Sequence, residues 1–244
     1  MRFTQPSYTA NLLQDICKAN GPLLHTLFCA RDYSKISFLA HLPPKPTLQD
    51  LASSVRELEF AWPTFLALWT ELTRVPGRPP VMFCLEGLQY VMQESAYRDP
   101  SFNKVHAHEL TLVRTFVDAL SGKAAFVNGG AVLAVSGGND TDRIPSLDLA
   151  LSQITAGSAG AEVPEPDPWE KGYDDKVYDA VKDVKVLRVG SVTKAEARGV
   201  MEYWARSGML MERVTEPLVS TRWTLGGHGV LGEMEKASLL RMRY

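Results

Sequence analysis

The chain has 244 residues, of which 45% are hydrophobic and 22% charged, and this composition excludes a disordered or fibrous protein. Lys and Arg number 26 against 28 Asp and Glu, and the net charge of −2 argues against a protein that holds nucleic acid through a general positive field, although a local basic patch is still allowed. No apolar run approaches the ~18 residues of a membrane span, and the widely spaced Cys17, Cys29 and Cys84 are expected to be free, buried thiols in a reducing compartment.

Residues 1–78 are expected to form a helical segment that flanks the rest of the chain. Apolar residues at helical spacing predict helices over 9–20, 47–58 and 61–73. Asn20-Gly21-Pro22 would end the first helix, and Thr47 is a suitable N-cap for the second. Pro63 suits the first turn of the third helix.

Residues 79–190 are expected to form an α/β core. Continuous apolar runs predict strands over 81–85, 129–136 and 184–189. Because such runs are typical of strands covered on both faces, they indicate a parallel sheet. Helices are expected over 88–94, 108–121 and 145–152, with loops over 95–105 and 156–170.

Residues 191–244 are expected to form a small C-terminal domain of the winged-helix kind. Thr193 and Glu196 have the spacing of a capping box, which predicts the start of a helix with Trp204 on its apolar stripe. The segments 209–213 and 219–225 suggest a small β-ribbon, and a last helix is expected over 231–242.

Polar residues follow the first two predicted strands, at the ends where open α/β sheets bind ligands. Glu86 comes directly after the first strand, as the acid of a Walker-B element does, and could hold Mg²⁺ directly or through water. Ser136 and Asn139 follow the second strand, where P-loop ATPases have a residue that senses the γ-phosphate. Glu86, Ser136 and Asn139 are therefore the candidate nucleotide-site residues.

The loop that cradles phosphates in such proteins is absent from the sequence. The pattern G-x-x-x-x-G-K-S/T occurs nowhere. Gly122-Lys123 is the one Gly-Lys pair, and it is followed by Ala124, with Val117 where the first Gly belongs. Without the amides and the Lys of that loop, nothing in the chain cradles the β- and γ-phosphates.

An α/β-hydrolase is a different interpretation of Ser136. The run Ala134-Val135-Ser136-Gly137-Gly138 comes close to the nucleophile elbow G-x-S-x-G, and Asp167 and His228 follow in the order that such enzymes use. The elbow requires a helix directly after the Ser, whereas residues 137–145 have the composition of a loop.

His106 and His108 stand two residues apart at a predicted helix start. A metal site is disfavoured there because no third ligand is near, so an ordinary helix N-terminus is the preferred interpretation.

Several segments in order resemble one family, the fungal mitochondrial small-subunit ribosomal proteins of the death-associated-protein-three family. The likeness covers nearly all of the chain and lies in the segments His106–Lys123, Asn128–Ala134, Glu196–Trp204 and Val214–Arg243. Glu86 falls where the family usually has Asp after its Walker-B strand, and Ser136 and Asn139 match its sensor-like turn. The sequence departs from the family in beginning after the first strand, the phosphate loop and the second strand.

The resemblance implies a partial P-loop NTPase core of the AAA/STAND type with parallel strands, followed by a C-terminal helical lid with the small β-ribbon. It implies a structural protein in the head of the mitochondrial small ribosomal subunit, in the matrix, with contacts toward the large subunit. Its partners would be mitochondrial ribosomal proteins and, to a lesser extent, rRNA. GTP or ATP with Mg²⁺ is expected only in the full-length family member, and no cofactor or catalytic residue is expected in this chain alone. An NTPase, or its regulatory remnant, is the alternative.

The resemblance also implies a strand order. P-loop proteins of this type order their strands 5-1-4-3-2, and the three strands predicted here correspond to the third, fourth and fifth. The strands over 81–85 and 129–136 should therefore pair directly and in parallel. A vacant slot should separate the second of them from the strand over 184–189, because the first strand of the family is missing.

The purified chain is expected to show no nucleotide hydrolysis of its own, because the phosphate loop is absent. Release of phosphate from ATP and GTP measures this, with Glu86→Ala as the matched control. Turnover above background that disappears in the Glu86→Ala variant would contradict the expectation.

Overall fold

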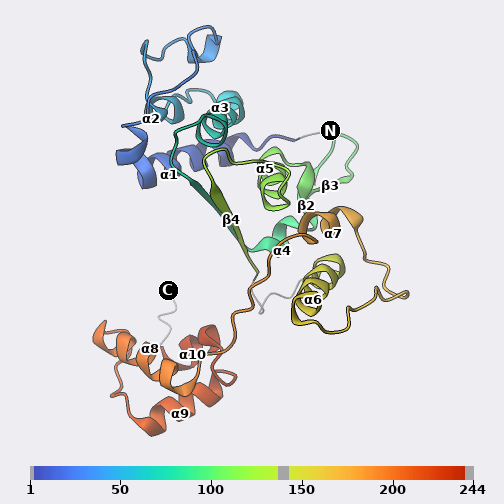
Figure 1. Cartoon of the computed structure of the whole chain (residues 1–244). Helices are drawn as coiled ribbons and strands as arrows, with labels where there is room; N and C mark the ends of the chain where they lie inside the picture. Colours follow the sequence, from blue (N-terminus) through green and yellow to red (C-terminus); the bar gives the residue numbers. More distant parts are fainter. Residues whose placement is uncertain (1–2, 137–142, 240–244) are drawn as a thin grey trace. The chain divides into compact units, whose positions relative to one another are not determined.

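The computed structural model describes residues 3–136 and 143–239, and Figure 1 shows the helices and strands that they form. The chain divides into two compact units, Met1–Val186 and Leu187–Tyr244. The domain limits after residues 78 and 190 remain predictions about which parts fold separately. No helix within the described ranges is both long enough and apolar enough to cross a bilayer.

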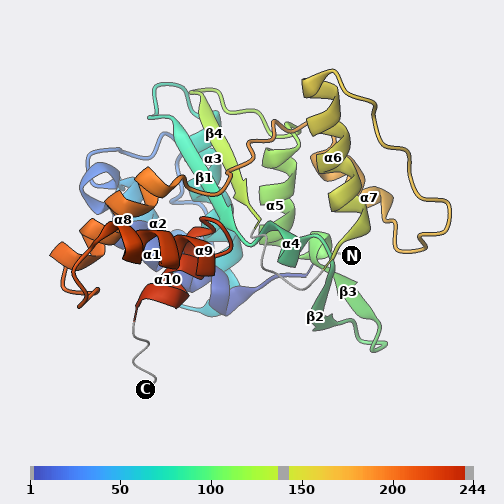
Figure 2. The same ribbon diagram turned by 90° about the horizontal axis from the view of Figure 1, so that it is seen from below.

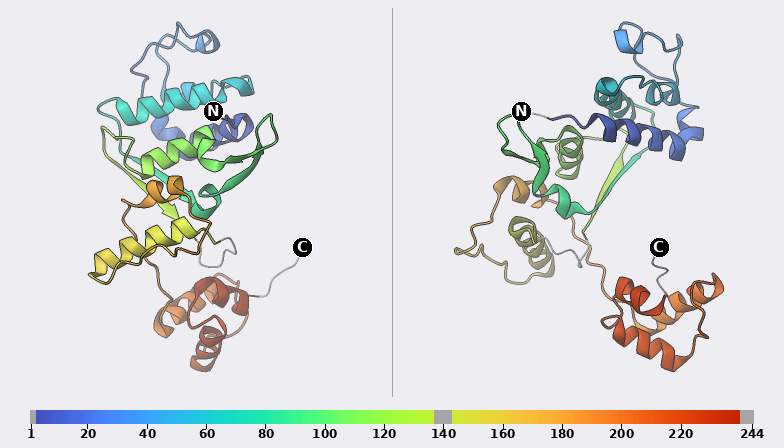
Figure 3. Two further views of the ribbon diagram at one scale, coloured as in Figure 1. Left: turned by 90° about the vertical axis from the view of Figure 1, so that its right-hand side faces the viewer. Right: turned by 180° about the vertical axis from the view of Figure 1, so that it is seen from behind.

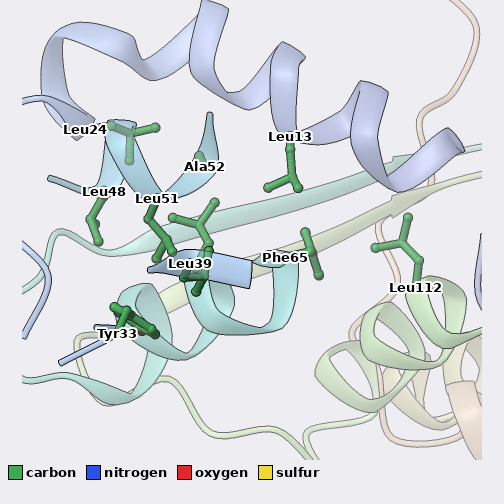
Figure 4. Close-up of a cluster of buried hydrophobic side chains, with 10 residues drawn as sticks. Leu13, Leu24, Tyr33, Leu39, Leu48, Leu51, Ala52, Phe65 and Leu112 are labelled. Atoms are coloured by element: carbon green, nitrogen blue, oxygen red, sulfur yellow. The ribbon is translucent and has the colours of Figure 1, made fainter. Parts of the chain in front are cut away.

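The N-terminal part of the first unit is a layer of helices around an apolar core. It contains α1 (Pro6–Leu24), α2 (Leu48–Ala52), α3 (Ala61–Arg74) and two single turns of 3₁₀ helix, η1 (Ser37–Leu39) and η2 (Leu58–Phe60). Figure 4 shows the buried side chains that these elements share, among them Leu13 of α1, Leu51 of α2 and Phe65 of α3. Each helix buries the apolar stripe from which it was predicted.

The predicted end of the first helix is wrong, because α1 continues past Asn20 and through Pro22 to Leu24. Pro22 lies in the last turn, where its ring removes one N–H donor from the helix ladder. The next turn still closes, since the His25 N–H donates to the Gly21 carbonyl at 2.9 Å.

The second helix starts as predicted and ends early. The Thr47 hydroxyl accepts the Asp50 N–H at 3.1 Å, and the Asp50 carboxylate accepts the Thr47 N–H at 2.8 Å, which completes a capping box. α2 nevertheless ends at Ala52. The Ser54 hydroxyl donates to the Leu51 carbonyl at 2.7 Å, a local bond that competes with a further helical turn.

The central sheet of the first unit consists of two parallel strands, β1 (Val81–Glu86) and β4 (Gly130–Val135). They pair directly from Val81 opposite Gly130 to Glu86 opposite Val135, which confirms the predicted pairing. Gly130 is needed at the start of β4, because a Cβ there would lie 2.4 Å from the Val81 carbonyl oxygen. In the described part of the chain, neither outer edge of this sheet is paired with another strand.

The expectation that these strands are covered on both faces is wrong. Exposure alternates along them, so that Phe83 and Val132 pack inward while Met82 is 70% and Leu133 50% exposed. Within the described part of the first unit, helices pack against one face only. The strands therefore follow the period-two pattern of a half-covered sheet.

The helices on the covered side of the sheet are α4 (Leu88–Val91), α5 (Thr111–Leu120), α6 (Pro145–Ala159) and α7 (Asp175–Val181) (Figures 1 and 3). Phe116, Leu147 and Val181 from the last three of these share a buried cluster with the inward-facing strand residues. Both panels of Figure 3 show α6 and α7 side by side. The helical layer joins the sheet through Trp69 of α3, whose ring centre lies 4.9 Å from that of Phe83.

The predicted loop over 95–105 is instead a β-hairpin. β2 (Glu94–Arg98) and β3 (Lys104–His106) pair antiparallel and lead into the 3₁₀ turn η3 (Ala107–Glu109). The helix predicted over 88–94 therefore stops at Val91, where α4 ends. The hairpin strands are short and mostly polar, so no apolar alternation marks them in the sequence.

The second unit contains three helices in its described part, α8 (Lys194–Arg206), α9 (Glu216–Leu225) and α10 (Leu231–Ser238). The predicted capping box is confirmed, because the Thr193 N–H donates to the Glu196 carboxylate at 2.8 Å. Trp204 and Met201 of α8 pack with Met234 of α10 in a buried cluster.

The predicted β-ribbon over 209–213 and 219–225 is wrong. The Thr215 hydroxyl caps α9 and Pro217 lies in its first turn, a position that suits proline, so residues 219–225 are helical. Residues 209–213 form no strand.

The predicted third strand over 184–189 is also wrong, because this segment forms no strand. Leu187 and Val189 are almost fully exposed. A strand needs a partner backbone for its N–H and carbonyl groups, and no described strand pairs with this segment. The vacant slot beside β4 stays a prediction, because the segment runs from the first unit into the second.

A buried carboxylate ties the helical layer to the sheet. Glu71 of α3 is fully buried, and its Oε2 lies 2.6 Å from Nη2 of Arg78, just before β1. The same carboxylate accepts the Ala30 and Arg31 N–H groups and the Tyr33 hydroxyl, at 3.0 to 3.2 Å. Burial raises the pKa of Glu71, but these hydrogen bonds outweigh burial and hold the pKa below its ordinary value, so the group is charged.

Asn128 extends this connection to β4. Its Nδ2 donates to the Val75 carbonyl at 2.7 Å, directly after α3, and its Oδ1 accepts the Arg78 N–H at 3.2 Å. One polar network therefore holds the end of α3 and the approaches to both strands.

The Glu71→Gln variant is expected to lose about 3 kcal/mol of unfolding free energy or more, because it leaves the buried Arg78 guanidinium without a counter-charge. Urea unfolding followed by circular dichroism measures the loss. The matched control is Glu59→Gln in η2, an exposed position where a change under about 0.5 kcal/mol is expected. Equal losses in the two variants would contradict the role given to the buried pair.

Candidate functional site

The carboxyl ends of β1 and β4 meet at one edge of the sheet. Glu86 is the register partner of Val135, so Glu86 and Ser136 lie at the ends of neighbouring strands, as predicted for candidate ligand-site residues. The Gly87 N–H donates to the Val135 carbonyl at 2.8 Å. Gly87 has a φ of 76° and the Tyr90 ring leaves no room for a Cβ, so only glycine fits the turn that follows Glu86.

Glu86 and Ser136 are both exposed at this edge. Within the described ranges the Glu86 carboxylate forms no ion pair. Asn139, the third candidate, lies outside the described residues. The nucleotide-site role of these residues stays a prediction.

The side of the β1–β4 sheet away from the helices is apolar and exposed. We call it the outer face, and it consists of Met82, Cys84, Ala131, Leu133 and Val135, with the exposed Glu86 opposite Val135 at its carboxyl end. The Cys84 thiol is free but exposed, so the expectation that all three cysteines are buried is wrong. Contiguous apolar surface of this kind is typical of a protein–protein contact.

The two histidines near η3 are buried and hold local structure. His106 Nδ1 accepts the His108 N–H at 3.1 Å, and His106 Nε2 lies 3.5 Å from the Asp174 carboxylate. His108 Nε2 lies 3.3 Å from Met92 Sδ. In the part of the chain that the structure describes, no group of three or more His, Cys, Asp or Glu could hold a metal ion.

The structure gives the hydrolase interpretation no support. The Asp167 carboxylate accepts the Trp169 N–H at 2.9 Å within a local turn. His228 belongs to the second unit, where its ring centre lies 5.0 Å from that of Trp223, whereas Ser136 and Asp167 belong to the first.

Comparison with known proteins identifies the family of the chain. The family described as "Mitochondrial ribosomal death-associated protein 3" matches residues 1–237. The chain belongs to this family. The resemblance found in the sequence is thereby confirmed.

Two relatives of this death-associated-protein-3 family member carry the name "Small ribosomal subunit protein mS29". The Neurospora crassa protein is 47% identical over 247 residues, which cover 99% of this chain and 52% of that protein. The Schizosaccharomyces pombe protein is 25% identical over 150 residues, which cover 62% of this chain and 29% of that protein. The chain thus spans about half the length of the Neurospora crassa relative. Its match to the Schizosaccharomyces pombe relative covers less than half of that protein.

Sequence reasoning missed two surface features of this family member. The outer face was missed because a continuous apolar run looks the same whether a strand is covered on one face or on two. The β2–β3 hairpin was missed because its strands are polar. The cluster Asp99-Pro100-Ser101, which favours a turn, was the available signal for it.

The buried histidines predict a pH-dependent stability. Burial lowers the pKa of His108 to about 4, and it also lowers the pKa of His106 despite the nearby Asp174 carboxylate. The unfolded chain therefore binds these protons more tightly, so stability is full above a pH of about 6.5 and falls as the pH drops toward 4. We expect His108 to remove about 2 kcal/mol of unfolding free energy between pH 7.5 and pH 5.

Urea unfolding at these two pH values measures the effect. His108→Gln should flatten the difference between them, and His41→Gln, at an exposed position, should leave it unchanged. A His108→Gln variant with the full pH dependence would show that other groups cause it.

Proposed function

We propose that the chain is a structural constituent of the mitochondrial small ribosomal subunit, in its head and therefore in the mitochondrial matrix. The observation that carries this proposal is the 47% identity, over 99% of the chain, to a protein named as a small ribosomal subunit protein. In this role the chain acts mainly through contacts with other mitochondrial ribosomal proteins, including contacts toward the large subunit, and to a lesser extent with rRNA.

The surface of the first unit supports a role in protein contacts. The outer face exposes Met82, Leu133 and Val135, three apolar side chains on adjacent strands. The net charge of −2 suits contacts with proteins better than a broad contact with RNA.

The family's nucleotide site is a separate proposal. We infer that the chain contains part of a P-loop NTPase core of the AAA/STAND type, and that Glu86, Ser136 and Asn139 are remnants of its site for GTP or ATP with Mg²⁺. In support, Glu86 and Ser136 share the sheet edge at which such folds bind ligands. The sequence lacks the loop that would cradle phosphates, so nucleotide binding requires the full-length family member and this chain is not an enzyme. A regulatory NTPase remnant is the alternative.

The tagged chain, expressed in mitochondria, is expected to sediment with the small ribosomal subunit on a sucrose gradient. The combined substitutions Met82→Glu and Leu133→Glu should reduce the bound fraction more than about tenfold, because an apolar contact would then bury two unpaired carboxylates.

The matched control combines Leu58→Glu and Val163→Glu, two exposed apolar positions away from the outer face, and should sediment like the unmodified chain. An unmodified chain found only in ribosome-free fractions would overturn the proposed function. A double outer-face variant that still sediments with the subunit would show that the contact lies elsewhere.

A further inference from the structure

The β2–β3 hairpin presents a tip whose backbone is fixed by its own hydrogen bonds. Figure 2 and the left panel of Figure 3 show the hairpin projecting from the helices of the first unit. The Asp99 carboxylate accepts the Ser101 and Asn103 N–H groups, each at 2.8 Å, and the Asp99 N–H donates to the Asn103 carbonyl at 2.9 Å. The tip is therefore shaped before any partner arrives.

Phe102 occupies this tip in a backbone conformation that bulky residues rarely adopt. Its φ is 64°, in the left-handed region, and its ring is 79% exposed. The Arg98 guanidinium holds the conformation by donating from Nη1 to the Phe102 carbonyl at 2.8 Å. A strained residue that keeps a large ring in water does nothing for the stability of the chain, and such residues cluster where ligands bind.

Two cations lie opposite each other at the same end of the hairpin. Arg98 and Lys104 are register partners in the β2–β3 ladder, and both are exposed. Like charges at opposed positions destabilise a ladder. Among the described residues no carboxylate forms an ion pair with either cation, and the neighbouring Asp99 carboxylate is occupied by the N–H groups of the tip. An anion held by both cations would relieve their repulsion.

We propose that this tip binds single-stranded RNA. Arg98 and Lys104 hold a backbone phosphate, and the Phe102 ring stacks on an unpaired base, with the 48% exposed Tyr97 as a second aromatic surface. An acidic peptide would pair with the two cations but leave the Phe102 ring exposed to water. A nucleotide pairs its phosphate with the cations and stacks its base on the ring. A duplex is disfavoured because its bases are already stacked on each other. The proposal rests on the proposed function for the presence of rRNA, and it adds the residues and the kind of RNA.

The test measures binding of the full chain to a fluorescein-labelled 12-nucleotide RNA of mixed sequence, single-stranded or as a duplex, by anisotropy at several KCl concentrations. Phe102→Gly removes the ring and relieves the strained φ, so the fold is retained, and the affinity for the single strand should fall about tenfold. Arg98→Gln with Lys104→Gln should weaken binding and lower the slope of log K against log salt by about 1.4. Lys104→Gln alone leaves the Arg98 bond to the Phe102 carbonyl in place, so it should lower the slope by about 0.7 without lowering the melting temperature.

The controls remove the same chemistry elsewhere on the first unit. Phe28→Ala takes away another exposed ring, and Lys35→Gln with Lys45→Gln takes away two other exposed cations. These controls should bind RNA like the unmodified chain. An unmodified chain that does not bind the single strand, that prefers the duplex, or that the hairpin substitutions affect no more than the controls would overturn the proposal.

Sedimentation with the small subunit separates this proposal from the proposed function. If the hairpin variants leave the subunit but keep their RNA affinity, the tip binds a protein, and the RNA proposal is overturned while the proposed function stands. If RNA affinity depends on the hairpin and the unmodified chain does not sediment with the subunit, the proposed function fails and the RNA proposal stands.

Discussion

The first unit depends on the buried ion pair between Glu71 and Arg78. Three parts of the chain converge on the Glu71 carboxylate, namely α3, the segment at Ala30 and Arg31, and the approach to β1. Burying a charge is costly unless it is paired and hydrogen-bonded, and here four donors share that role. Because the donors come from separate segments, the helical layer and the sheet are fixed relative to each other.

That arrangement leaves a parallel sheet with one covered face. Parallel strands occur almost only in sheets with both faces covered, so the outer face is unusual in an isolated unit. The apolar side chains of Met82, Leu133 and Val135 gain nothing from exposure to water. The proposed ribosomal role accounts for this surface, since neighbouring ribosomal components would provide the missing cover.

The sequence predicted those features that depend on local pattern. Two apolar runs predicted β1 and β4, and the carboxyl ends of parallel strands necessarily meet, so Glu86 and Ser136 were predicted to share an edge. The 184–189 segment has an apolar pattern too, but a strand also requires a partner, which a local pattern does not reveal. In α9, the start signal of Thr215 and Pro217 sets residues 219–225 in a helix, where one strand of the ribbon was predicted.

Tertiary features were beyond the reach of the sequence. Glu71 lies in an apolar helix, where a single acid normally marks the solvent side. Its burial depends on Arg78 and on the N–H groups of residues 30 and 31, which only the fold brings together. The positive φ of Phe102 likewise depends on the hydrogen bonds of the complete tip, so the residue types alone did not predict it.

The cysteines of the first unit differ sharply in chemical reactivity as a result of this architecture. Burial and the charge of Glu71 raise the pKa of Cys29 to about 12, so Cys29 stays protonated. A protonated thiol is a much weaker nucleophile than a thiolate. Cys84 is a free cysteine whose side chain is exposed to solvent on the outer face. An alkylating reagent would therefore modify Cys84 when that face is open, spare it when a partner covers the face, and leave Cys29 unmodified in both cases. The chain thus contains a native footprinting label at the centre of the surface that assembly would bury.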